Sequence, residues 1–206
     1  MFRTPVILPW IYPTLVWRIP TEEKEIFLTF DDGPVPGPTE FVLDTLKKNN
    51  IVATFFLIGD NVRKHPEIFH RIVDDNHVIG NHTFNHLKGW SYRNNEYVTN
   101  IQKCDEAFGF TSQLFRPPYG RIKKSQIKEL TNYQIIMWDV LTSDYATSMS
   151  PEKCLAGSIR ATRPGSIVVF HDSLKAERNM SYALPRYIEH FRDRGYVFKM
   201  ISTTKI

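Results

Sequence analysis

Short apolar runs alternate with amphipathic stretches along most of the chain. The apolar runs predict strands at residues 26–30, 53–58, 77–80, 113–116, 134–138, 166–170 and 196–201. The stretches between them predict helices at residues 38–48, 66–75, 95–108, 123–130, 151–162 and 182–194. Two helix ends carry local signals, since Ser150 precedes Pro151 as an N-cap would and Gly195 suits a left-handed C-terminal position.

Strand and helix alternate about seven times, which predicts an α/β domain with a mainly parallel sheet. The chain has no Gly-x-Gly-x-x-Gly fingerprint, and its 206 residues fall below the roughly 250 residues typical of a full (β/α)8 barrel. We therefore expect a short or incomplete (β/α) barrel with about seven parallel strands. A doubly wound open sheet is the alternative.

The N-terminal segment, residues 1–25, is apolar but is interrupted by Pro5, Pro9 and Pro13. These prolines exclude a continuous signal-type helix or a membrane span. We expect an extended lead-in packed on a domain of residues 26–206, and its aromatic residues leave open a surface for a sugar or a lipid. No export signal is readable, so we expect a cytoplasmic location, and removal of a leader is the alternative.

Composition narrows the class of protein. The chain carries 26 Lys and Arg residues against 22 Asp and Glu residues, a net charge of +4, and the basic residues are scattered. This pattern gives little support for a nucleic-acid partner. Cys104 and Cys154 are too few and too far apart for a disulfide framework or a cysteine metal site.

Polar side chains with catalytic potential follow the predicted strands at their carboxyl ends. They are Asp31 and Asp32 after the first strand, His82 and His86 after the third, Arg116 at the end of the fourth, Asp139 and Asp144 after the fifth, and His171 after the sixth. In α/β barrels this rim carries the active site, so we expect these segments to converge on one mouth.

The stretch "GNHTFNH" places His82 and His86 at i and i+4, on one side of a helical turn, where both imidazoles could face one metal. Alone, such a pair is more often structural. No Glu follows His82, so this is not the helix of an H-E-x-x-H protease and a general base must come from elsewhere. Since a catalytic zinc commonly has three protein ligands, one of Asp31 and Asp32 could complete the site and the other could act as base.

Two further residues are candidates for the same site. Arg116, in "RPPYG", could pair with the carboxylate that does not bind the metal, and a surface salt bridge is the alternative. His171 directly follows the apolar run "SIVVF" and is a candidate general acid because it lies on the same rim. A lone His at such a position is more often a hydrogen-bonded structural residue.

Five motifs, "TFDDGP", "HTFNH", "RPPYG", "WDVLTSDY" and "GSIVVFHD", resemble in order those of the polysaccharide deacetylase family, the NodB homology domain of carbohydrate esterase family 4. The resemblance runs from Ile26 to about Ile201. It implies a distorted (β/α) barrel and a metal-dependent hydrolase, usually with zinc, with cobalt or another divalent ion as alternatives. Its implied substrates are N-acetylated sugars of the chitooligosaccharide or peptidoglycan type, and some family members act on O-acetylated xylan.

The resemblance also implies roles for individual residues. Asp31 would be the catalytic base, and Asp32, His82 and His86 would be the metal ligands. Arg116 would orient Asp31.

Four more residues receive implied roles around the substrate. The backbone N–H of Tyr119 would help to hold the oxyanion, and His171 would be the acid. Trp138 would line the pocket near the acetyl group, with Tyr119 and Asp144 as further substrate contacts.

One motif departs from the family pattern. Many members have Asp-x-x-Asp-Trp where this chain reads Leu141-Thr142-Ser143-Asp144-Tyr145, so the first carboxylate and the final Trp are replaced. This leaves open how the charge of His171 is tuned. Two other functions stay open: a hydrolase of another C–N bond, in a small cyclic amide or a formyl or lipid-linked sugar, and a non-catalytic carbohydrate-binding protein, which the intact candidate residues disfavour.

Overall fold

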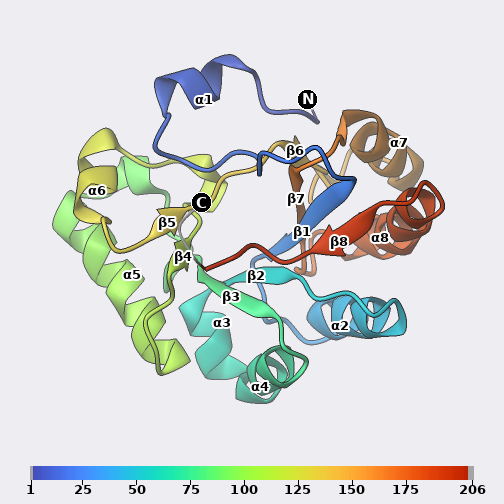
Figure 1. The fold of residues 1–206 in the computed structure, drawn as a ribbon. Helices are drawn as coiled ribbons and strands as arrows, with labels where there is room; N and C mark the ends of the chain where they lie inside the picture. Colours follow the sequence, from blue (N-terminus) through green and yellow to red (C-terminus); the bar gives the residue numbers. More distant parts are fainter. Residues whose placement is uncertain (1, 204–206) are drawn as a thin grey trace.

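A curved parallel sheet lies at the centre of the computed structural model, which describes residues 2–203 (Figure 1). Its strands are β1 (Glu25–Asp31), β2 (Thr54–Leu57), β3 (Val78–Asn81), β4 (Leu114–Phe115), β5 (Gln134–Ile135), β6 (Val140–Leu141), β7 (Ser166–His171) and β8 (Val197–Lys199). The helices are α1 (Ile7–Ile11), α2 (Pro38–Lys48), α3 (Gly59–Lys64), α4 (Pro66–Asp74), α5 (Asn94–Phe108), α6 (Lys124–Glu129), α7 (Pro151–Ala161) and α8 (Glu177–Arg192), with short 3-10 turns at Gly89–Ser91 and Pro118–Gly120.

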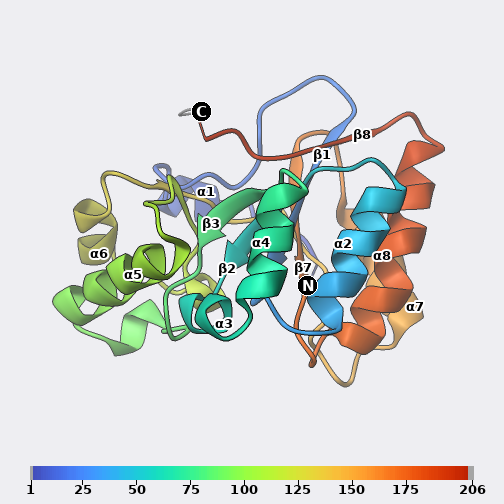
Figure 2. The ribbon, with the colours of Figure 1, turned by 90° about the horizontal axis from the view of Figure 1, so that it is seen from below.

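The strand order is β5-β4-β3-β2-β1-β7-β6, with β8 also paired to β1, and all these pairs are parallel. Helices α2 to α8 are arranged around the outside of the sheet (Figure 1), and α2 and α8 lie side by side (Figure 2). The sheet does not close between β5 and β6. The structure thereby confirms the predicted incomplete (β/α) barrel, with all of the expected strands and one more, β6.

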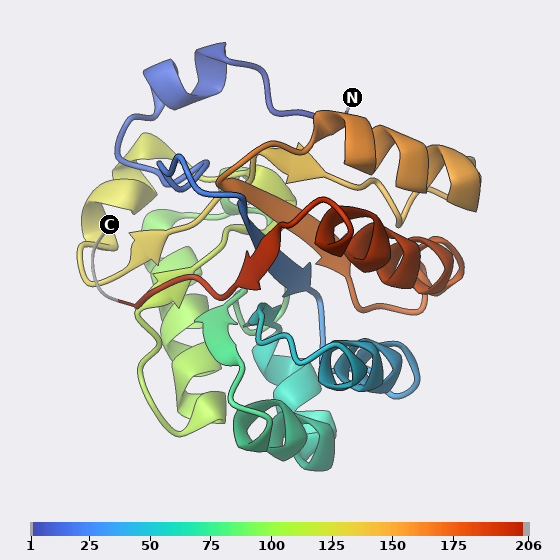
Figure 3. The same cartoon turned by 45° about the vertical axis from the view of Figure 1, so that its right-hand side comes forward.

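β1 is the central strand and shares its edges with three others. It pairs with β7 along its length, whereas its other edge pairs first with β8 and then with β2 (Figure 3). The register sets Asp31 beside His171 at the carboxyl ends of the two strands. Between the sheet and its helices, the ring of Phe30 stacks on the rings of Phe55 and Phe170, which fixes these strands by burying large apolar surface.

The fifth predicted strand is shorter than expected. It ends at Ile135, and the chain forms a separate strand, β6, from Val140. Asp139 therefore precedes a strand, and its carboxylate accepts hydrogen bonds from Arg163 and from Ser166 at the start of β7. The expectation that Asp139 joins the catalytic rim is wrong, because it lies at the opposite end of the sheet.

The N-terminal segment lies across the gap between β5 and β6. It makes isolated bridges from Arg3 to Val140 and from Val16 to Ile136. It differs from the extended lead-in that its prolines predict, since Ile7–Ile11 forms a short helix. Pro9 is tolerated there because N–H groups in the first helical turn have no intrahelical acceptor. Among the described residues, no helix has the length and apolar character needed to cross a bilayer.

Candidate active site

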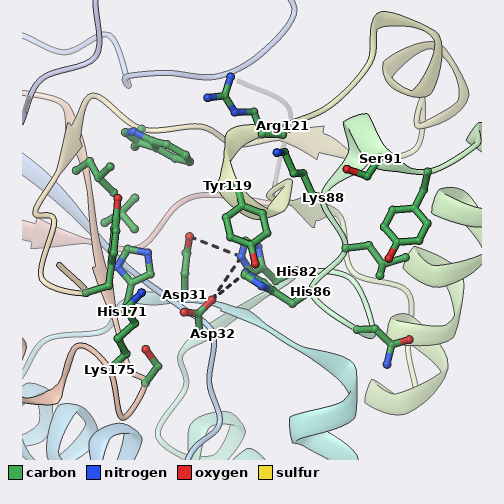
Figure 4. Close-up of a pocket in the computed structure, with 18 residues that line it drawn as sticks. Asp31, Asp32, His82, His86, Lys88, Ser91, Tyr119, Arg121, His171 and Lys175 are labelled. Atoms are coloured by element: carbon green, nitrogen blue, oxygen red, sulfur yellow. Dashed lines mark ion pairs between the residues drawn. The ribbon is translucent and has the colours of Figure 1, made fainter. Parts of the chain in front are cut away.

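The carboxyl end of β1 presents two neighbouring carboxylates in different directions. Asp31 is the buried last residue of the strand, and Asp32 follows it with φ of 87°. This left-handed backbone is uncommon for a residue other than glycine and is typical of strained functional positions. It turns the Asp32 side chain toward the two histidines (Figure 4), while Asp31 pairs with Arg116.

Arg116 is fully buried beside Asp31. Its Nη1 donates to Asp31 Oδ1 at 2.6 Å and to Thr29 Oγ1 at 2.7 Å, and its other nitrogens donate to the carbonyls of Ile136 and Met137. Burial lowers the pKa of the guanidinium, and the charge of Asp31 opposes this shift. The pair is thus an internal ion pair and not the surface salt bridge that was the alternative.

Asp32, His82 and His86 bring three ligand atoms together. Asp32 Oδ1 lies 3.2 Å from His86 Nε2 and 3.8 Å from His82 Nε2, and the three ligand atoms all lie within 4.8 Å of one another. A tetrahedral ion with bonds of about 2.0–2.1 Å requires ligand atoms roughly 3.3 Å apart, so the donor set and its spacing fit a zinc-type ion.

The protonation states of this cluster also suit a metal. Burial, only partly opposed by Asp31 and Asp32, lowers the pKa of His82 to about 4, so its imidazole is neutral near pH 7. Burial would raise the pKa of Asp32, but the hydrogen bond from His86 and the charges of His171 and His82 hold it well below its usual range. The Arg116 carbonyl lies 2.7 Å from His82 Nδ1, which orients Nε2 toward Asp32. A neutral imidazole and an ionised carboxylate are the forms that bind metals.

The histidine pair does not lie on the helical turn that its spacing suggests. His82 to His86 form an irregular loop after β3, with φ of 65° at Thr83 and 56° at His86. The Asn81 side chain accepts from the Thr83 N–H, and the Thr83 hydroxyl accepts from the Leu87 N–H. These bonds bend the loop so that the imidazole rings of His82 and His86 point toward the same position. A helical turn would have given the same result through the i, i+4 spacing.

His171 is held from behind by a buried carboxylate. Asp144 Oδ1 accepts from His171 Nδ1 at 2.8 Å, and Asp144 Oδ2 accepts from the His171 backbone N–H at 2.8 Å. Burial would lower the pKa of His171, but the charge and hydrogen bond of Asp144, with the charges of Asp32 and Asp31, raise it to about 9. Asp144 therefore lies behind His171, away from the cavity surface where a substrate contact was expected.

One cavity of about 970 Å³ joins these groups. Its lining includes Asp31, Asp32, His82, His86, His171, Tyr119 and Trp138. Leu141 and Tyr145, which depart from the family motif, also line it, and so do three basic residues that sequence reasoning missed, Lys88, Arg121 and Lys175 (Figure 4). The basic residues lie on loops, where no periodic signal marks them.

Asp172 is a further residue that sequence reasoning missed. Its Oδ1 accepts from the Gly33 N–H at 3.0 Å, and its Oδ2 lies 2.6 Å from the Thr39 hydroxyl. Burial raises its pKa to about 8. Asp172 thus supports the turn after Asp32 as a protonated acid near pH 7, and the motif "GSIVVFHD" gave no signal of that burial.

Comparison with known proteins agrees with this geometry. The family model described as polysaccharide deacetylase matches residues 18–138. A peptidoglycan-N-acetylglucosamine deacetylase of Bacillus cereus is 36% identical over 197 residues, covering 90% of this chain and 71% of that protein. The peptidoglycan-N-acetylmuramic acid deacetylase PdaA of Bacillus subtilis is 33% identical over 191 residues, covering 88% of this chain and 72% of that protein.

A solved structure gives the same result in three dimensions. The crystal structure of the Bc1960 peptidoglycan N-acetylglucosamine deacetylase, in complex with 4-naphthalen-1-yl-N-oxidanyl-benzamide, superposes with a TM-score of 0.88 at 33% identity and covers 96% of this chain and 95% of that one. The resemblance carried by the five motifs is confirmed, and the chain belongs to the polysaccharide deacetylase family.

Proposed function

We propose that this chain is a metal-dependent hydrolase that removes N-acetyl groups from an N-acetylated glycan and releases acetate. The observation that carries this proposal is the register of β1 and β7, which sets a candidate base, Asp31, beside a candidate acid, His171, in the cavity of the Asp32 cluster. Two of the relatives are named as peptidoglycan deacetylases, which supports peptidoglycan as the substrate class. A third is named as a chitooligosaccharide deacetylase, so chitooligosaccharides are the second choice. We also propose residues 26–206 as the catalytic domain.

Asp32, His82 and His86 would hold one divalent ion, with zinc first and cobalt as an alternative. When bound, such an ion supplies Lewis-acid chemistry that polarises the acetyl carbonyl and acidifies water. His86 reaches Asp32 from the irregular loop after β3, so the loop must keep its shape for the three ligands to converge.

Asp31 would accept the proton of the attacking water. Its Oδ1 is engaged by Arg116, which leaves Oδ2 to receive that proton. The buried guanidinium pairs with the carboxylate and fixes its direction. Arg116 thus acts through Asp31 as a positioning residue.

His171 would donate a proton to the leaving nitrogen. Its Nδ1 is engaged by Asp144, so Nε2 is the atom left to face the substrate. An amine leaves readily only when protonated, which makes an acid as necessary as a base. The N–H of Tyr119 would bind the oxyanion of the substrate, a contribution of about 3–4 kcal/mol for one such donor in comparable sites.

Acetate release tests the proposal. Wild-type protein and Asp31→Asn would be compared on N-acetylglucosamine oligomers, peptidoglycan fragments and acetylated xylan, with zinc or cobalt added. Release that is lost in Asp31→Asn supports the deacetylase. A protein that binds metal but releases no acetate points to another C–N substrate, and one that binds glycan without metal or turnover points to a non-catalytic carbohydrate-binding protein.

A further inference from the structure

A second cavity, of about 440 Å³, lies beside the active-site cavity and is walled by the N-terminal segment. The two cavities share the lining residues Tyr119, Arg121, Trp138 and Leu141. A ligand can therefore extend from the catalytic residues into the second cavity. Leu8 and Ile11 contribute to its outer wall, and they lie outside the family-model match, which begins at residue 18.

Four polar side chains of this wall are already hydrogen-bonded within the protein, and the Arg121 guanidinium lies over the Trp90 ring at 4.3 Å. Arg3 Nε donates to the Ala161 carbonyl at 2.9 Å, and the Thr4 hydroxyl donates to the Trp138 carbonyl at 2.6 Å. The indole N–H groups of Trp17 and Trp90 donate to the carbonyls of Tyr12 and Ile122. Another sugar unit would have only the Arg121 guanidinium and the hydroxyl groups of Tyr12 and Tyr119 as side-chain partners here, whereas a hydrocarbon chain needs none and packs on the aliphatic lining.

An apolar surface continues outward from the cavity over α1. Ile11 lines the cavity and is 45% exposed, and Ile7 and Trp10 on the same helix are 58% and 85% exposed. No residue of α1 is buried. A chain longer than the cavity would thus leave it along a surface that is also apolar.

We propose that this cavity binds an aliphatic chain carried by the N-acetylated sugar substrate, so that the enzyme acts on an amphiphilic glycoside. The assignment of the sugar end rests on the proposed function. The aliphatic end rests on the apolar lining and on the residues that the two cavities share.

The test compares methyl and octyl N-acetyl-β-D-glucosaminide, each below the concentration at which it forms micelles. Binding to Asp31→Asn protein is followed by tryptophan fluorescence, because Trp17, Trp90 and Trp138 line the cavity. Each methylene that leaves water improves binding about fourfold, equivalent to about 0.8 kcal/mol. We expect the octyl compound to bind at least about tenfold more tightly, and wild-type KM to fall in the same direction.

Matched substitutions in α1 locate the effect. Leu8→Asp places a charge in the wall and should abolish the preference for the octyl compound, whereas Ile7→Asp, on the same helix but outside the lining, should keep it. Ile11→Trp fills the mouth from a half-exposed position and serves as the second variant if Leu8→Asp does not fold.

Equal binding of the two compounds, or an octyl preference that survives both Leu8→Asp and Ile11→Trp, would overturn the inference. An octyl preference that is lost in Leu8→Asp while wild-type protein releases no acetate from either compound would support the cavity assignment and count against the proposed deacetylase. The two failures are therefore distinguishable.

Discussion

Arg116 Nη1 donates a hydrogen bond to Asp31 Oδ1 at 2.6 Å, and the Arg116 side chain is fully buried. The other hydrogen bonds of Arg116 go to Thr29 and two backbone carbonyls, so each nitrogen of the guanidinium has a partner inside the protein. A buried ion pair is tolerated only under such conditions. The arrangement fixes one oxygen of the proposed base and leaves the other free for chemistry.

Arg116→Met should therefore both destabilise the protein and inactivate it. Removing one partner of a buried pair leaves an uncompensated charge and costs roughly 3–5 kcal/mol of unfolding free energy. Urea denaturation measures this change. Arg63→Met is the matched control, because Arg63 pairs with Asp60 on the surface and its side chain is 65% exposed, and about 1 kcal/mol or less is expected there. An equal loss in both variants would contradict the role assigned to burial.

Metal binding should depend on the irregular loop after β3. We expect His86→Ala to lose bound zinc after dialysis, while His65→Ala, on a histidine outside the cluster, retains it. Zinc at about 100 times its Kd should stabilise wild-type protein by about 2.7 kcal/mol, and a chelator should reverse the gain. Equal metal content in the two variants would remove His86 from the site.

Activity should fall as the pH rises past about 9. The acid form of His171 is required, and its pKa is raised to about 9 by Asp144 against the effect of burial. In Asp144→Asn that charge is gone and burial prevails, so the alkaline limb of kcat should move at least about one pH unit lower. Asp139→Asn, a buried carboxylate outside the cavity, should leave the limb in place. An unshifted limb in Asp144→Asn would show that His171 is not the acid.

Asp172 should make the protein less stable as the pH rises. Burial raises its folded pKa to about 8 from an ordinary value of 3.8, so between these values the unfolded chain has lost a proton that the folded chain keeps. Unfolding free energy then decreases with rising pH, by up to about 1.4 kcal/mol per pH unit.

Asp172→Asn should remove this dependence. The stability of the variant relative to wild type should grow from about pH 4 upward, and thermal unfolding in metal-free buffer measures the difference. The window from pH 4 to 6.5 is read as the difference between the two proteins, because the titrations of His77 and His82 inside it and of His171 above it are common to both. A constant difference across that window would contradict a raised pKa for Asp172.

Elements with strong local signals were predicted from sequence. Helix α2 runs from Pro38 to Lys48 as predicted, since Gly37 and Pro38 mark its start and its apolar face is regular. Helix α3 was missed because it has only six residues and begins with Gly59. β6 was missed because two residues, Val140 and Leu141, carry no period of their own and form a strand only through pairing with β7.

The parts of the candidate site that lie within one short motif could be predicted from the sequence. Asp31 and Asp32 stand out in the motif after β1, and the histidine spacing pointed to one metal although the loop is not helical. The position of Asp144 was not predictable, because it depends on packing against α8, where the Asn179 side chain donates to the Asp144 carbonyl. Arg121 and Lys175 reach the cavity from loops whose paths are set by the whole fold.

The pairing of β1 with three other strands, β2, β7 and β8, affects how the chain folds during synthesis. Glu25 to Phe27 pair with Val197 to Lys199, although β2, the other neighbour on that edge, is made far earlier. Pairing of strands so far apart in sequence is slow, because closing the long loop between them costs conformational entropy. The amino-terminal half of β1 therefore lacks one of its neighbours until residue 199 has been made, and the end of the sheet opposite the catalytic rim is completed last.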